Sequence, residues 1–158
     1  MDEAKGAHSI RWELPSVTPQ VVPGYTPIFS SALLCGNQVH LSGRLAKREG
    51  QLLVGRVDAE IPIDEARESA RGVALELLAA LREAAGGLDR VEALGRLFVM
   101  VRGAEHFTEP HVIANAASEV LLSVLGDRGK HARSAMGAAQ LPFGVCIEAE
   151  LSAFVRRS

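Results

Sequence analysis

The 158-residue sequence predicts a single α+β domain in which a mixed β-sheet carries two helices packed on one face. The first observation behind this prediction is the order of the periodic runs, β-β-(β)-α-β-α-β-β. The second is the composition, 47% hydrophobic and 23% charged, which is typical of a globular domain with its own core. Prolines punctuate the first residues, so we expect an extended N-terminal arm over residues 1–22, pinned by Trp12, and one domain over residues 23–158.

The domain is predicted to open with a β-hairpin. Two apolar runs, 28–35 and 38–42, flank the dipeptide Gly36-Asn37, which is typical of a two-residue hairpin turn. The dipeptide Ser42-Gly43 is expected to end the second strand. A short third strand is expected over residues 51–54, after a further turn.

The clearest element is an amphipathic helix over residues 64–85, about six turns long at ~3.6 residues per turn. Asp64 is the expected N-cap, and Gly86-Gly87 is expected to stop the helix. Helical spacing puts the apolar side chains on one face, which predicts burial of that face. These side chains are Ala66, Ala70, Val73, Ala74, Leu77, Leu78 and Leu81.

The run 90–101 predicts a long strand with apolar residues on both faces. Alternation places Leu97 and Val99 on one face, and Leu94 and Phe98 on the other. Because two helices can cover only one face of a sheet, we expect a partner subunit to cover the other.

A second amphipathic helix follows this strand. Thr108 or Glu109 is expected to begin it, with Pro110 in the first turn, and Gly126 is expected to end it. Its apolar face is predicted to pack beside the first helix on the same sheet.

The last quarter of the chain carries the best functional signal. Arg133 opens one strand-like run of small residues, and a second run carries Glu148 and Glu150 after a turn around Pro142. If the two runs pair as a hairpin, a guanidinium and a carboxylate meet on a small-residue surface suited to a small anionic ligand and a water. A close arginine would lower the pKa of Glu148. The alternatives to a functional site are that Arg133 is an ordinary surface arginine and that the two glutamates lie on a solvated strand face.

Charge and spacing exclude several other classes of function. The net charge of −2 and the scattered basic residues argue against nucleic-acid binding. The histidines lack metal-ligand spacing, so we expect no metal. Cys35 and Cys146 are expected to be reduced thiols. No apolar run approaches the ~20 residues of a membrane span, so we expect a soluble cytoplasmic protein without a membrane partner.

Several segments together resemble a known family. They are LCGNQVHLSGRL, GGLDRVEALGRLFVMV, HFTEPHVIANAASEVLLSVLG and HARSAMGAAQLPFGVCIEAEL. The closing R-S-x(6)-L-P-x(4)-I-E-x-E pattern is the most specific of them. The chain is similar over residues 20–155 to the reactive intermediate deaminase family (RidA/YjgF-like, endoribonuclease L-PSP-like), in its longer-chain branch.

The resemblance implies a chorismate-mutase-like fold assembled as a homotrimer, with ligand sites in clefts between subunits. It implies hydrolysis of 2-imino acids or enamines to 2-oxo acids and ammonia, without a cofactor. By the same resemblance, Arg133 grips the substrate carboxylate and Glu148 positions the attacking water. The implied substrate-binding residues are Ser42, Gly43, Asn115 and Ser134, with either Tyr25 or Phe29 in the place of the family tyrosine.

Two alternatives stay open beside deamination. One is a non-catalytic or regulatory trimer that binds a keto acid or an amino acid in the same cleft. The other is a ribonuclease or translation inhibitor, which the acidic net charge disfavours.

Overall fold

In the computed structural model, the described residues are 12–16 and 22–156. The elements alternate much as the sequence predicts, and short 3-10 turns join some of them. The strands are β1 (Ala32–Cys35), β2 (Gln38–Leu45), β3 (Lys47–Arg48), β4 (Gln51–Leu52), β5 (Val91–Val101), β6 (Ala132–Gly137) and β7 (Ile147–Val155). The helices are α1 (Ile63–Ala85) and α2 (Pro110–Leu125), and the 3-10 turns are η1 (Leu88–Arg90), η2 (Gly126–Gly129) and η3 (Pro142–Gly144).

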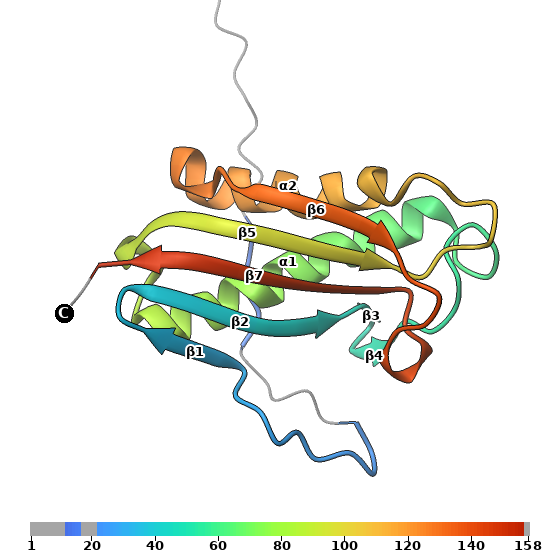
Figure 1. The fold of residues 1–158 in the computed structure, drawn as a ribbon, viewed down its shortest axis with the longest axis horizontal. Coiled ribbons are helices and arrows are strands. Elements are labelled where there is room, and N and C mark those ends of the chain that lie inside the picture. Colours follow the sequence, from blue (N-terminus) through green and yellow to red (C-terminus); the bar gives the residue numbers. More distant parts are fainter. Residues whose placement is uncertain (1–11, 17–21, 157–158) are drawn as a thin grey trace, which may run out of the picture.

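One sheet in the order β1-β2-β7-β5-β6 organises the domain. The pair β5–β6 is parallel and the other neighbouring pairs are antiparallel, so the sheet is mixed. The helix α2 makes the crossover that a parallel pair requires. Both helices lie on the same face of the sheet, α1 behind β2 and β7 and α2 behind β6 (Figure 1). The predicted α+β architecture is confirmed.

The predicted closing hairpin is wrong. The strand β6 pairs with β5, and β7 lies between β2 and β5, so β5 separates the two runs. Every second residue of β7 from Ile147 to Val155 is buried, and a strand with such a continuous apolar side is most stable in the middle of a sheet. The segment around η3 is long enough to carry the chain past β5.

The first hairpin forms with the predicted turn at Gly36-Asn37, where Gly36 has a φ of 65°. The strand β1 begins at Ala32, later than expected. The strand β2 does not end at Ser42-Gly43 but continues to Leu45, with a register shift between Leu41 and Arg44 against β7. The dipeptide is therefore a bulge within a strand, which redirects the side chains around it.

The helix α1 begins one residue before its predicted start. Pro62 occupies the N-cap position and its carbonyl oxygen accepts the first helical bond from Ala66, at 3.0 Å. Asp64 therefore lies inside the first turn, where its charge still complements the helix dipole, but it is not the cap. Gly86 ends the helix in the left-handed conformation, as predicted. The helix α2 begins at Pro110, one residue after Glu109, which is its N-cap, and ends before Gly126 as predicted.

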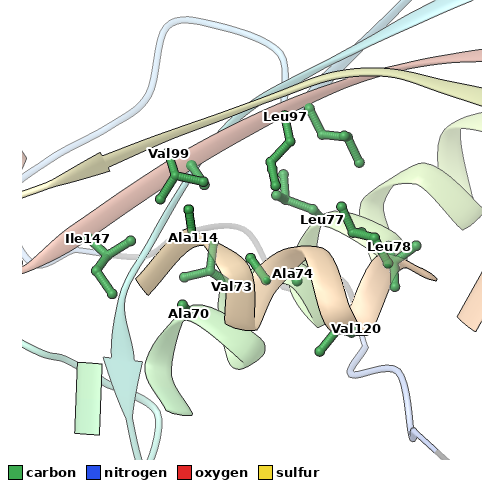
Figure 2. Close-up of a cluster of buried hydrophobic side chains, with 14 of the residues drawn as sticks. Ala70, Val73, Ala74, Leu77, Leu78, Leu97, Val99, Ala114, Val120 and Ile147 are labelled. Carbon is green, nitrogen blue, oxygen red and sulfur yellow. The ribbon is translucent and has the colours of Figure 1, made fainter. Parts of the chain in front are cut away.

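The core lies between the sheet and the two helices (Figure 2). Leu97 and Val99 of β5 share this core with Val73 and Leu77 of α1, and alanines on both helices allow close packing. Leu94 is also buried, although alternation assigned it to the opposite face. Register shifts on both sides of Leu94 break the alternation and turn it into the core.

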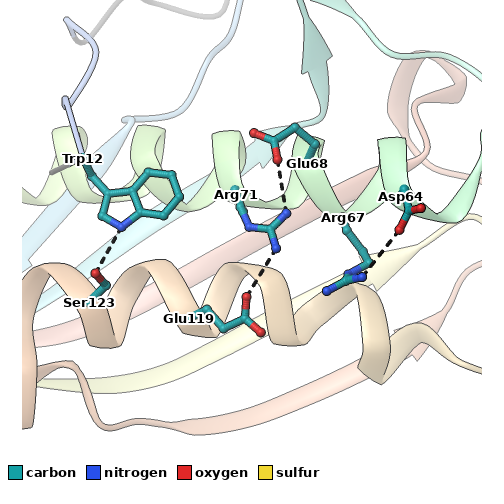
Figure 3. Close-up of polar contacts among 7 residues, drawn as sticks. All are labelled: Trp12, Asp64, Arg67, Glu68, Arg71, Glu119 and Ser123. Carbon is teal, nitrogen blue, oxygen red and sulfur yellow. Dashed lines mark hydrogen bonds and ion pairs between the residues drawn. The ribbon is translucent and has the colours of Figure 1, made fainter. Parts of the chain in front are cut away.

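Polar contacts tie the outer surface of the helical layer together (Figure 3). Arg71 of α1 pairs with Glu68, at 3.1 Å, and with Glu119 of α2, at 3.4 Å. Trp12 Nε1 donates a hydrogen bond to Ser123 Oγ, at 3.1 Å, and its ring packs against the core. Trp12 thus holds residues 12–16 against the helices, while residues 1–11 and 17–21 of the expected arm lie outside the described residues.

No helix among the described residues combines the length and the apolar character needed to cross a membrane.

Candidate functional site

The sheet has two unlike faces, and the predicted site residues are divided between them. Alternate residues of β7 from Ile147 to Val155 face the helices, so Glu148 and Glu150 face the opposite side. Arg133 points toward α2, to which it donates hydrogen bonds. Within one chain, Arg133 and Glu148 therefore lie on opposite faces of the sheet, and the single crevice expected from the hairpin does not form.

Arg133 is held by two side chains of α2. Its Nη1 donates to Asn115 Oδ1, at 2.9 Å, and to Ser118 Oγ, at 3.0 Å. Asn115 and Ser118 share one side of the helix because they are three residues apart. The Nε and Nη2 groups of Arg133 donate to none of the described residues and remain accessible. The accessible edge of the guanidinium has the fork geometry that binds a carboxylate through two hydrogen bonds.

Sequence reasoning missed Ser118 and did not use His131. Ser118 Oγ lies 2.9 Å from His131 Nε2, and His131 Nδ1 lies 2.7 Å from the carbonyl oxygen of Gly129. The only signal for Ser118 in the sequence is its helical spacing from Asn115. His131 precedes Arg133 by two residues, but no pattern tells from sequence that both side chains reach the same helix.

Glu148 lies against the bulge of β2. A Cβ atom added to Gly43 would overlap the carboxylate oxygen Oε1 of Glu148, so a side chain at this position would displace that carboxylate. In register, Glu148 is flanked by Leu45 of β2 and Met100 of β5, which pack into a small apolar cluster.

Burial among these neighbours, and then the charge of Glu150, raise the pKa of Glu148 above its usual value. This direction is opposite to the one expected from sequence, because Arg133 of the same chain is on the other face.

A cavity of about 120 Å³ lies beside the bulge. Its lining includes four of the predicted residues, namely Tyr25, Phe29, Ser42 and Gly43, together with Arg44 and Phe143. The rings of Tyr25 and Phe143 meet edge to face, with centroids 5.4 Å apart. Both aromatic candidates for the family tyrosine position thus reach one cavity.

Ser134 belongs to neither group. It follows Arg133 in β6 and faces the side without helices, where its hydroxyl accepts a hydrogen bond from Arg96 Nη2 at 2.6 Å. Cys146 is fully buried in the helix-side core rather than on the face of Glu148, and burial raises its pKa to about 12. Such a thiol is inert at neutral pH.

Among the residues that the structure describes, no group of three or more His, Cys, Asp or Glu side chains is placed to hold a metal ion.

Fold and site together define a class of small α+β proteins. In this chain, one mixed sheet carries two helices on one face, and the polar groups of the candidate site are divided between that layer and a bulge in the second strand. The family model described as "YjgF/chorismate_mutase-like, putative endoribonuclease" matches residues 8–152, and the chain belongs to this family.

The relatives agree with this assignment. The chain is 40% identical over 124 residues to "Protein TCP17" of Trypanosoma cruzi, covering 77% of this chain and 78% of that protein. The crystal structure of Atu1372 from Agrobacterium tumefaciens, titled as of unknown function, is 28% identical with a TM-score of 0.79 and covers 84% of this chain and 86% of its own. A structure titled as a "putative endoribonuclease" from Shewanella oneidensis MR-1 is 26% identical with a TM-score of 0.80, covering 90% of this chain and 92% of its own.

Proposed function

We propose that this protein hydrolyses reactive 2-imino acids and enamines to 2-oxo acids and ammonia, without a cofactor, in a cleft between neighbouring protomers of a homotrimer. The observation that carries this proposal is the hydrogen bonding of the Arg133 guanidinium. Two α2 side chains hold one nitrogen of its guanidinium, while the other edge is accessible and unbonded among the described residues. A pre-oriented fork of this kind favours a small carboxylate ligand.

The division of the site between two faces supports an assembly. Arg133 with Asn115 forms one half, and Glu148 with Ser42-Gly43 and its cavity forms the other. One protomer cannot offer both halves to one small molecule. In the proposed trimer, the arginine half of one protomer meets the glutamate half of the next, and each cleft is complete.

Glu148 has the properties of a proton acceptor. Its pKa is raised by burial and by Glu150, so its carboxylate is a stronger base than an exposed one. In the proposed reaction, the imine is protonated on nitrogen, and Glu148 takes a proton from a water as the water oxygen bonds to the carbon of the C=N group. Glu148 then returns that proton to the amino group of the adduct. The C–N bond breaks as the hydroxyl of the adduct loses its proton to the departing ammonia, which leaves the 2-oxo acid and ammonium.

The substrate carboxylate on Arg133 sets the position of that carbon. Imines also hydrolyse without a catalyst, so positioning supplies most of the acceleration that is needed. The Ser42-Gly43 bulge, against which the carboxylate of Glu148 lies, borders the cavity that would receive the adduct.

The experiment generates 2-iminobutanoate in situ with an amino acid oxidase and follows ammonia release against the spontaneous rate. The wild-type protein should accelerate release, and Arg133→Lys should lower kcat/KM by about 10²-fold or more, because lysine keeps the charge but loses the fork. Arg82→Lys, at an exposed position of α1, is the matched control and should behave as wild type.

Near-normal turnover by Arg133→Lys would contradict the proposal. So would a wild-type protein that binds 2-oxobutanoate but releases no ammonia above the spontaneous rate, since that result describes the non-catalytic binding trimer.

A further inference from the structure

A chain of hydrogen bonds runs from Arg133 away from the accessible edge of its guanidinium. Arg133 Nη1 donates to Ser118 Oγ at 3.0 Å, and Ser118 Oγ lies 2.9 Å from His131 Nε2. His131 Nδ1 lies 2.7 Å from the carbonyl oxygen of Gly129. Three elements contribute to the chain: β6 supplies Arg133, α2 supplies Ser118, and the segment after η2 supplies His131.

Each bond in this chain has a definite direction when the ring is neutral. The carbonyl oxygen of Gly129 can only accept, so Nδ1 of His131 carries the proton. The other ring nitrogen, Nε2, is then an acceptor and takes the hydroxyl proton of Ser118. The lone pairs of Ser118 Oγ are left to accept from Arg133. His131 therefore fixes the orientation of the hydroxyl group that accepts from the arginine.

The far end of the chain is fixed to the fold. Gly129 is buried at the end of η2, and a Cβ atom there would overlap the backbone of Leu121 in α2. The carbonyl that orients His131 is therefore held at a constant position relative to the helix that carries Ser118. Without His131, the hydroxyl of Ser118 is free to turn toward the backbone of its own helix, as serine hydroxyls in helices commonly do.

We propose that His131 and Ser118 are positioning residues that aim the guanidinium of Arg133 at the carboxylate of its ligand. The inference rests on the proposed function only in taking that carboxylate to be the substrate's. Asn115 gives Arg133 a second contact on the same nitrogen, so loss of the chain misdirects the arginine without releasing it. The expected defect is in carboxylate binding rather than in the chemical step.

The experiment compares His131→Ala, Ser118→Ala and Ser118→Thr with His111→Ala, an exposed position of α2, as the control. His131→Ala and Ser118→Ala should raise KM for 2-iminobutanoate about three- to tenfold, as expected for one lost hydrogen bond, with kcat within about twofold. Binding of 2-oxobutanoate, measured by calorimetry, should weaken by the same factor. Ser118→Thr keeps the hydroxyl and should stay near wild type.

A second measurement needs no ligand or turnover. In crystal structures of His131→Ala and Ser118→Ala, the side chain of Arg133 should leave the rotamer it has in the wild-type protein. An unchanged Arg133, or KM and binding equal to those of His111→Ala, would overturn the inference. If the wild type binds 2-oxobutanoate without turnover and the variants weaken that binding, the positioning role stands and the deaminase proposal fails.

Discussion

At the scale of single residues, the most informative group is Glu148, whose pKa is set by its surroundings. It is flanked by apolar neighbours of a small cluster, lies against Gly43 in the bulge, and shares its strand face with Glu150. Burial and the second carboxylate both disfavour its charged form, which raises its pKa. A carboxylate kept in such a place at neutral pH destabilises the fold, as functional groups often do.

The sign of this effect gives a prediction for stability. The pKa of Glu148 is higher in the folded chain than in the unfolded one, so its stabilising contribution is present below the unfolded pKa. That contribution is lost as the pH rises through the folded pKa. Glu148→Gln should therefore raise the Tm at pH 7, with the difference from wild type vanishing in acid, and should abolish ammonia release. Thermal unfolding from pH 4 to 8 tests the predicted change in Tm. Glu105→Gln, in an exposed loop, is the control.

The same shift predicts how turnover depends on pH. The base form of Glu148 should be lost on acidification at a pH above the usual glutamate range, because the pKa is raised. Glu150→Gln removes one cause of the shift and should move the acid limb of kcat/KM to lower pH. An acid limb unmoved by Glu150→Gln would mean that a different group titrates.

At the scale of elements, the glycines of α1 and β2 differ in the space that surrounds them. Gly72 lies on the exposed side of α1, and a Cβ atom there would contact nothing within 4 Å. Gly43 lies in the bulge, where a Cβ atom would overlap the carboxylate of Glu148. A side chain at Gly72 would contact nothing, whereas a side chain at Gly43 would displace the carboxylate of Glu148.

Gly72→Ala should therefore stabilise the protein by about 0.5–1 kcal/mol, the usual difference in helix propensity, with no change in activity. Gly43→Ala should give no such gain and should lose activity, since it displaces Glu148. Urea unfolding at one fixed protein concentration measures the first effect, and ammonia release measures the second. A stabilised and fully active Gly43→Ala would show that the bulge does not position Glu148.

At the scale of the whole molecule, the face of the sheet opposite the helices is the unusual feature. It carries Phe98, Met100, Met136 and Phe154, and Met136 is 48% exposed. The two helices cover the other face (Figure 1). Apolar side chains spread over a bare sheet face are typical of a surface that another subunit covers, which agrees with the proposed trimer.

Met136→Lys should disrupt that assembly, because it places a charge in the proposed interface. Leu122→Lys is the matched control: Leu122 is 43% exposed on α2, away from that face. Light scattering after size exclusion should give three times the chain mass for the wild type and for Leu122→Lys, and a smaller mass for Met136→Lys. Ammonia release should fall with the trimer. A monomeric wild-type protein would refute the intersubunit site.

Local physics explains what could be predicted before the structure. The helix periodicities, the Gly86 stop and the Gly36-Asn37 turn depend on neighbours in sequence, and the structure confirms each of them. The segment quoted around Arg133 and Glu148 led to the family that the comparison confirms. Predictions that needed a partner far along the chain were less secure, as the closing hairpin shows.

The sequence by itself determined the elements, the family and the residue types available for chemistry, because these follow from short-range spacing. Only the tertiary structure decided that β7 lies between β2 and β5, and hence that Arg133 and Glu148 face opposite sides of the sheet. Strand order depends on which apolar faces can be buried together, and a pKa depends on what packs around the group. Both are properties of distant contacts that no local pattern in the chain specifies.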